Sequence, residues 1–395
     1  MEQKIIINYD PKQTRVALLE DGKVVEIYFE RPLHQRLVGN IYKGVVENVL
    51  PGMQAAFVNI GEERNAFYYV DEVPQPGGEE AKEGKLPIQR LLRVKDEVLV
   101  QVMKESFGSK GARLTGQITL PGRYLVLMPG LNYVGVSRRI VSQEERERLK
   151  KEMENLHPPN MGVIVRTAAE GADTNSLKND LQNLLHIWQK INNQFPKVKA
   201  PALLYRDPAL IYQIVRDLFN DHVVQLIIDN KEQYNKIMEH LDCFSPHLKE
   251  RMVYYDKRQP IFEHFAIEEE IERSLNRMVW LKCGGYLVFD ETEALTAIDV
   301  NTGKYTGKSN LEETILKTNL EAVEEIARQI RLRDIGGIII IDFIDMHLPE
   351  NRQLVLEKLK QEMNKDRTKS HVLGITSLGL VEVSRKKVKQ GLSAV

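Results

Sequence analysis

Short runs in which hydrophobic and polar residues alternate open the chain and predict strands. Residues 4–30 contain three such runs, KIIINY, TRVALLE and KVVEIYF, and Asp21-Gly22 is typical of a hairpin turn between the second and the third. Three strands bury too little apolar surface to form a core alone. We therefore expect later chain to cover them. Residues 211–275, with helical patterns around the strand VVQLIID, are the expected cover.

Residues 38–117 also favour short strands, interrupted by the loop VPQPGGEEAKEGKLP, which is rich in proline, glycine and charge. Five short strands of this kind predict a small barrel of the OB type. Phe57, Phe67 and Tyr68 lie near the expected turns. Aromatic rings among cations suit single-stranded nucleic acid, where one stacked base contributes roughly 1–3 kcal/mol. The pattern alone favours the alternative that the rings fill the barrel. The cationic residues nearby are Lys43, Lys104, Lys110 and Arg113.

Residues 118–210 combine strands with two helices. The strand patterns are GRYLVLMPG, NYVGVSRR and GVIVRT, and the helical ones are SQEERERLKKEMENL and SLKNDLQNLLHIWQKINNQF. Arg166 and Thr167 end the strand GVIVRT. A guanidinium beside a hydroxyl can hold a phosphate. A surface arginine at a strand end is the commoner interpretation of these residues alone.

A strand, a helix and a second strand are predicted from residue 285 onward. GYLVFDETEALTAIDV predicts a hairpin, the next helix runs from Ser309 to about Arg333, and GGIIIIDFID predicts a strand that is buried on both faces. Such a unit places its two strands parallel through a right-handed crossover, with their carboxyl ends on one edge of the sheet. Asp299 ends the first strand and Asp342 the second, so we expect the two carboxylates to meet there.

Carboxylates that end an apolar strand need a cationic partner, because an unpaired buried carboxylate is costly. Asn301, two residues after Asp299, points to the same side of an extended strand. Two carboxylates and an amide oxygen suit Mg²⁺, which keeps several waters and binds substrate phosphates. The alternative, in which Asp299 and Asp342 cap helices or form ion pairs, stays equally open. Asp345 is expected to have a structural role.

Composition and charge narrow the class of protein. The 395 residues have a net charge of −1 and a mean hydropathy of −0.35, no apolar run reaches the ~18 residues of a membrane span, and the first residues lack the features of a signal peptide. The two cysteines, Cys243 and Cys283, exclude a disulfide framework and a cysteine-rich zinc site. We expect a cytoplasmic protein of several domains. Arg367, Lys369 and His371 form a local basic patch that suits phosphate contact, although a solvated surface also explains them.

Four segments resemble the bacterial ribonuclease E/G family: ETEALTAIDVNTG, TNLEAVEEIARQIRLRDIGGIIIIDFIDM, NIYKGVVENVLPGMQAAFVNIG and GRYLVLMPG. The similarity covers essentially the whole chain, in family order. It implies an α/β multidomain fold in which an RNase H-like domain is interrupted by two insertions and followed by a DNase I-like α/β catalytic domain. The implied ranges are 1–37 and 211–275 for the RNase H-like domain, 38–117 for an OB-fold RNA-binding domain, 118–210 for a 5′-sensor domain and 276–395 for the catalytic domain.

The resemblance also implies roles for single residues. Asp299 and Asp342 match the Mg²⁺-binding aspartates of the family, with Mn²⁺ as a substitute, and Asn301 matches their companion. Lys104, a cation near the aromatic residues of the barrel, and Lys369 are expected to be further RNA contacts. Thr302 and Lys369 stand where the family often has Ser and Arg. Arg166, Thr167 and the backbone of Gly122 and Val126 match a pocket for a 5′-monophosphate, whereas Phe57, Phe67 and Lys110 match positions that grip RNA.

The implied activity is that of a Mg²⁺-dependent endoribonuclease that acts in RNA processing and mRNA decay. It would cut single-stranded RNA to 5′-phosphate and 3′-hydroxyl ends and be stimulated by a 5′-monophosphate. The alternatives are an RNA-binding module, inactive in this truncated form, and a DNA-directed phosphodiesterase. The sequence ends at GLSAV, where the family's Cys-Pro-x-Cys zinc link is expected to follow. We therefore expect no zinc in this chain, and a monomer or weak homodimer.

Overall fold

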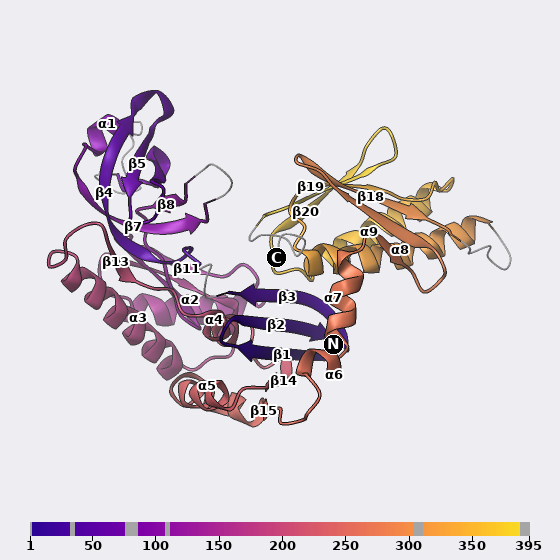
Figure 1. The fold of residues 1–395 in the computed structure, drawn as a ribbon, viewed down its shortest axis with the longest axis horizontal. Helices are drawn as coiled ribbons and strands as arrows, with labels where there is room; N and C mark the ends of the chain where they lie inside the picture. The colour runs from indigo at the N-terminus through magenta and orange to yellow at the C-terminus, as the bar shows by residue number, and fades with distance from the viewer. Residues whose placement is uncertain (1, 32–35, 76–85, 107–110, 304–310, 388–395) are drawn as a thin grey trace. The chain divides into compact units, whose positions relative to one another are not determined.

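The computed structural model describes residues 2–31, 36–75, 86–106, 111–303 and 311–387. They form two compact units, each of mixed α/β structure (Figure 1). The first unit contains Met1–Phe29, Asp221–Tyr234 and Arg251–Val395, and the second contains Glu30–Asn220 and Asn235–Glu250. Within the described ranges, no helix combines the length and the apolar composition that a membrane span requires.

The first sheet of the first unit has the order β15-β14-β1-β2-β3. Its antiparallel part is the predicted meander, and Asp21 and Gly22 in the turn both have positive φ. Ile261, Phe262 and Ile267 pack with the buried residues of the meander, so this part of the later chain covers it as expected. The elements are β1 (Gln3–Asp10), β2 (Gln13–Glu20), β3 (Lys23–Glu30), β14 (Val223–Ile228), β15 (Met252–Tyr254), α6 (Ile261–His264) and α7 (Ile267–Leu275).

The second unit begins with a small barrel. Its sheet has the order β13-β4-β5-β6-β8-β7, and a further pairing of β4 with β7 closes it. Val58 packs so tightly against Gly44 that a Cβ there would lie 2.5 Å from its Cγ1. The elements are β4 (Ile41–Leu50), β5 (Ala55–Asn59), β6 (Ala66–Tyr69), α1 (Ile88–Leu91), β7 (Glu97–Lys104), β8 (Arg113–Thr115) and β13 (Ala202–Tyr205), with short 3-10 turns at Pro51–Met53 and Val70–Glu72.

The rest of the second unit is a four-stranded sheet of order β11-β12-β10-β9 with helices packed on it. The helix α2 begins after Ser142, whose hydroxyl accepts from the N–H of Glu145, and α3 begins after Asp173, whose carboxylate accepts from the N–H of Ser176. The elements are β9 (Leu120–Pro121), β10 (Leu125–Pro129), β11 (Val134–Val136), α2 (Gln143–Leu156), β12 (Met161–Val165), α3 (Thr174–Gln194) and α4 (Leu210–Asp217); α5 (Lys231–Phe244) contributes to both units.

The C-terminal sheet of the first unit contains the predicted strand–helix–strand unit. Its order is β16-β17-β18-β19-β21-β20, and β18 and β19 are parallel, joined by the helix α8 (Figure 1). The described part of that helix begins at Leu311, and Ser309 lies outside the described residues. The elements are β16 (Met278–Trp280), β17 (Tyr286–Glu291), β18 (Leu295–Asn301), α8 (Leu311–Arg333), β19 (Gly337–Asp342), α9 (Pro349–Met363), β20 (Ser370–Ile375) and β21 (Val381–Arg385).

The isoleucine strand β19 is buried on one face only, so the prediction of burial on both faces is wrong. Ile339 and Ile341 are fully buried in the core under α8 and α9, whereas Ile338 is 54% exposed and Ile340 is half-buried. Both helices pack on the same side of the sheet. We call the opposite side of this sheet the open face. Because successive side chains of a strand point to opposite sides, every second residue of each strand lies on the open face.

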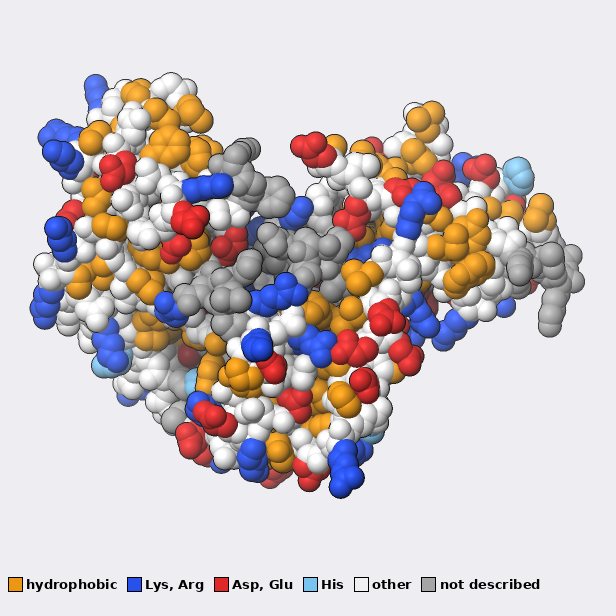
Figure 2. Space-filling model, in the orientation of Figure 1, with side chains coloured by type: hydrophobic (Ala, Val, Ile, Leu, Met, Phe, Trp, Pro, Cys, Tyr) orange, Lys and Arg blue, Asp and Glu red, His pale blue; other side chains and the backbone are white. Residues whose placement is uncertain are grey.

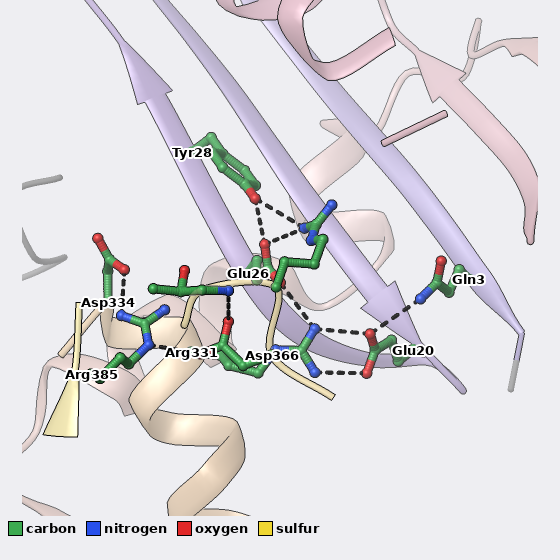
Figure 3. A network of polar contacts seen from close by, with 10 residues as sticks. Gln3, Glu20, Glu26, Tyr28, Arg331, Asp334, Asp366 and Arg385 are labelled. Atoms are coloured by element: carbon green, nitrogen blue, oxygen red, sulfur yellow. Dashed lines mark hydrogen bonds and ion pairs between the residues drawn. The ribbon is translucent and has the colours of Figure 1, made fainter. Parts of the chain in front are cut away.

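A network of buried ion pairs joins the meander to the end of α8 (Figure 3). Arg331 bonds to Glu20 and Glu26, each at 2.9 Å. Burial would raise the pKa of Glu26, but the guanidinium groups of Arg367 and Arg331 lower it to about 2. Arg367 bonds to Glu26 and to the Tyr28 hydroxyl, so the expectation that it contacts phosphate gives way to a structural role. Within the first unit, these bonds hold the two sheets together.

Candidate active site

The register of β18 and β19 places Asp299 directly opposite Asp342. The two residues lie on the open face, since Ile298, Val300 and Ile341 beside them are buried on the other face. The Nδ2 of Asn301 donates a hydrogen bond of 2.6 Å to Oδ2 of Asp299. The structure thus brings the three predicted residues together at the carboxyl edge of two parallel strands.

Three carboxylates, those of Asp299, Asp342 and Asp345, concentrate negative charge at this edge. Burial and the neighbouring carboxylates of Asp299 and Asp345 raise the pKa of Asp342. Asp345 is exposed, and the structural role expected for it stays a prediction. Like charges on neighbouring strands oppose each other until a cation lies between them.

Asn319 fixes the chain that leaves this edge, and the sequence pattern gave it no role. It is fully buried in α8, its Nδ2 donates to the Ile344 carbonyl at 2.8 Å, and its Oδ1 accepts from the Ile344 N–H at 3.1 Å. A side-chain amide that satisfies both polar groups of one residue holds that residue in place. The signal in the sequence that could have revealed this role is an asparagine among the apolar residues of the predicted helix.

The donor set fits a hard divalent cation. Over the described parts of the chain, no cluster of three or more His, Cys, Asp or Glu side chains is arranged to hold a metal ion. The oxygen donors gathered at this edge are the carboxylates of Asp299 and Asp342 and the side-chain amide of Asn301. Mg²⁺ is commonly held by one or two carboxylates, with water and substrate phosphate completing the octahedron.

Arg166 and Thr167 follow β12 in the second unit. The guanidinium of Arg166 donates to the Gly122 carbonyl and forms an ion pair of 2.7 Å with Asp217 at the end of α4. The Thr167 hydroxyl lies 2.9 Å from that of Ser137. Sequence reasoning missed Asp217, which lies fifty-one positions after Arg166 in the chain and carries no local signal.

The backbone near Gly122 is held by Asp180 of α3. This buried carboxylate accepts the N–H groups of Arg123, Tyr124 and Leu125, and a Cβ on Gly122 would lie 2.5 Å from its Oδ2. The N–H of Gly122 already donates to the Leu125 carbonyl, and Val126 pairs within the sheet. The structure therefore fixes the backbone at Gly122 and Val126, and Arg166 contacts the first of them through its carbonyl.

Phe57 and Phe67 form the aromatic part of a surface pocket on the barrel. They are register partners with ring centroids 4.6 Å apart, and they line a pocket of about 480 Å³ with Asn48, Arg64, Asn65 and Gly111. Tyr68, the next residue of β6 after Phe67, pairs with Ala56, is 2% exposed and packs in the core of the barrel. Phe57 and Phe67 are half-buried and line the pocket, so part of each ring reaches the surface of the barrel.

The cationic residues predicted near the barrel differ in their surroundings. Lys43 is buried and bonds to Glu97 and to the Val198 carbonyl, so its role is structural. Arg113 pairs with Glu72 and stacks over Tyr69. Lys104 is exposed at the end of β7, and Lys369 is exposed just before β20. Lys110 lies outside the described residues.

Comparison with known proteins identifies the family. The model of the "Ribonuclease E/G family" matches residues 119–388. The chain belongs to the ribonuclease E/G family. Ribonuclease G of Escherichia coli (strain K12) is 44% identical over 400 residues, which cover 100% of this chain and 82% of that protein. Ribonuclease G of Haemophilus influenzae is 44% identical over 99% of this chain and 81% of that protein. Ribonuclease E of Nostoc sp. (strain PCC 7120) is 42% identical over 95% of this chain and 55% of that protein. The resemblance seen in the sequence is thereby confirmed.

Proposed function

We propose that the protein is an endoribonuclease that hydrolyses single-stranded RNA with Mg²⁺ held by Asp299 and Asp342. The observation that carries the proposal is the register pairing of these two aspartates at one sheet edge, with Asn301 bonded to the first of them. Membership of the ribonuclease E/G family supports RNA as the substrate. RNA processing and mRNA decay in the cytoplasm are the corresponding roles.

The residues of this edge prepare the site for cleavage. Asn301 orients the Asp299 carboxylate, and Asn319 holds the chain that follows Asp342. When bound, Mg²⁺ would orient the attacking water for in-line attack and offset the charge that develops on the phosphate. The proposed products are a 5′-phosphate and a 3′-hydroxyl. Mn²⁺, with the same preference for oxygen ligands, is the proposed substitute.

Other residues of the chain are proposed to bind the RNA away from the bond that is cut. Phe57 and Phe67 offer a surface on which a base can stack, and Lys104 and Lys369 are exposed cations that suit phosphate. Arg166 and Thr167 are proposed to recognise a 5′-monophosphate and so to stimulate cleavage. A phosphate there would have to share or replace the Asp217 carboxylate that Arg166 now binds.

We propose the domain arrangement that the family implies, with the ranges given above. The barrel supports an OB-fold RNA-binding domain at 38–117, and the meander with its parallel neighbours supports an RNase H-like domain built from 1–37 and 211–275. Residues 118–210 are the proposed 5′-sensor domain and 276–395 the DNase I-like catalytic domain. A chain free of zinc that forms a monomer or a weak homodimer stays a prediction.

A cleavage assay tests the proposed function. Labelled single-stranded RNA with a 5′-monophosphate is incubated with the protein, with Mg²⁺ and with EDTA, beside a DNA oligonucleotide of the same sequence. We expect RNA cleavage only with Mg²⁺, and a downstream fragment whose mass shows one phosphate on its new 5′ end. RNA that binds without being cut would support the RNA-binding module instead. Equal cutting of DNA would support a DNA-directed phosphodiesterase.

A further inference from the structure

An aromatic pair projects from the open face of the C-terminal sheet. Trp280 of β16 is 59% exposed, and its ring centroid lies 5.3 Å from that of Tyr286 on β17, with the ring planes at 58°. Figure 2 shows hydrophobic side chains reaching the surface over the region where Figure 1 draws the C-terminal strands. A tryptophan so exposed loses much of the stabilisation that burial would give it, which favours a role in binding.

The pair is continuous with the proposed active site through the register of the sheet. Trp280 is the partner of Tyr286, and Tyr286 is the partner of Asn301. Residues that are directly opposite on neighbouring strands share a face, so the three side chains lie on the open face with Asp299 and Asp342. Two strand spacings separate Trp280 from Asn301, a distance of roughly 10 Å.

The hairpin that carries the aromatic pair is firmly held. Glu321 of α8 accepts the N–H groups of Lys282 and Cys283 in the turn between β16 and β17. The backbone of Gly303, just past Asn301, lies against the Tyr286 ring, since a Cβ there would be 3.3 Å from the ring Cδ1. Rings carried on a backbone that is already held lose less entropy on binding than rings on a mobile segment.

We propose that Trp280 and Tyr286 form a stacking platform for a base of the RNA substrate, beside the bond that Asp299 and Asp342 cut. The inference rests on the proposed function and adds a binding position to it. The carboxylates hold the phosphate backbone only when a cation lies between them, so RNA beside them gains from an attraction that does not depend on charge. Stacking supplies that attraction and tolerates every base, because each base has a π-face.

Intrinsic fluorescence tests contact between RNA and the platform. The chain has two tryptophans, Trp280 and the half-buried Trp188 of α3. A Trp188→Phe variant therefore reports on Trp280 alone, and a Trp280→Phe variant, which keeps Trp188, is the matched control. Both carry Asp342→Asn so that the RNA stays intact. We expect single-stranded RNA to quench Trp280 saturably and to leave Trp188 unchanged. No quenching of Trp280 at RNA concentrations that saturate binding would overturn the proposal.

Kinetics with modified RNA test whether the stacked base matters for cleavage. We expect Trp280→Ala to raise KM roughly 5- to 150-fold with little change in kcat, and Trp280→Phe to restore most of the loss. A series of RNAs, each with one abasic nucleotide at a different position, tests which base stacks. For the wild-type protein we expect KM to rise when the abasic nucleotide is at one position near the cut. In Trp280→Ala the same modification should cost nothing further. Fully additive losses would refute the platform.

The two proposals fail in different ways. If the wild-type protein cuts RNA with Mg²⁺ but Trp280→Ala keeps its KM, the platform is wrong and the endoribonuclease stands. If RNA quenches Trp280 but the wild-type protein cuts no RNA, the proposed function is wrong. Fluorescence of Trp280 that changes with protein concentration but not with added RNA would overturn the platform. It would assign this face to contact between copies of the chain.

Discussion

Replacing Asn319 by Ala should loosen the acidic edge from inside the protein. Asn319 makes two hydrogen bonds with the backbone of Ile344, and alanine would leave both backbone groups without this partner. An unsatisfied buried polar group costs about 1–3 kcal/mol. Because Ile344 is half-buried and water can reach it in part, we expect a loss of about 2–3 kcal/mol in the free energy of unfolding.

The same substitution should weaken the response to Mg²⁺. The segment held by Asn319 carries Asp342 at its start, two residues before Ile344. Loss of a group that orients metal ligands typically lowers metal affinity or activity 10- to 100-fold. We therefore expect the Mg²⁺ concentration needed for half-maximal cleavage to rise by at most about 100-fold. Urea denaturation and a Mg²⁺ titration of the cleavage rate measure the two effects.

A matched control separates this effect from general damage to α8. Lys317 is exposed on the same helix, two positions away, and Lys317→Ala should leave both stability and the Mg²⁺ titration close to wild type. If Asn319→Ala also behaved like the wild-type protein in both measurements, the assigned role of Asn319 would be refuted.

Two further predictions concern the second unit and the buried ion pairs. Arg166→Ala should bring the cleavage rate of 5′-monophosphorylated RNA down towards that of the triphosphorylated RNA, while circular RNA is cut as before; an unchanged ratio of the two rates would place the sensor elsewhere. Glu26 has an ordinary pKa of 4.5 and a folded-state pKa of about 2, so its ion pairs stabilise the folded protein fully above pH 4.5. This contribution, about 3 kcal/mol to the free energy of unfolding, is lost as the pH falls towards 2. Glu26→Gln should remove that part of the acid dependence of unfolding, and an identical acid profile for the variant and wild type would contradict the ion-pair account.

The pairing of Asp299 with Asp342 was accessible from the sequence because it depends on local patterns and one topological rule. A hydrophobic strand, a helix and a second strand leave few arrangements, and the crossover through the helix makes the two strands parallel. Phe57 and Phe67 were identified by family resemblance, whereas their pattern alone favoured packing. The pattern cannot tell which face of a strand is covered.

Other features depend on contacts between residues far apart in the chain. Four isoleucines indicate an apolar strand, but the exposure of Ile338 follows from both helices packing on one side of the sheet. The partners of Arg166 and Arg367 are Asp217 and Glu26, and no spacing in the sequence indicates either pair. Both partners become known only from the folded chain.

The central claim is that Asp299 and Asp342 act together on RNA, and single-turnover cleavage across a Mg²⁺ series tests it most directly. The variants are Asp299→Asn and Asp342→Asn, with Asp290→Asn as control, because Asp290 lies on the same sheet but is paired with Arg277. We predict that each of the first two lowers the cleavage rate roughly 100-fold or more, with RNA affinity within a few-fold of wild type, while the control cuts normally. Wild-type rates in either variant at saturating Mg²⁺ would contradict the account.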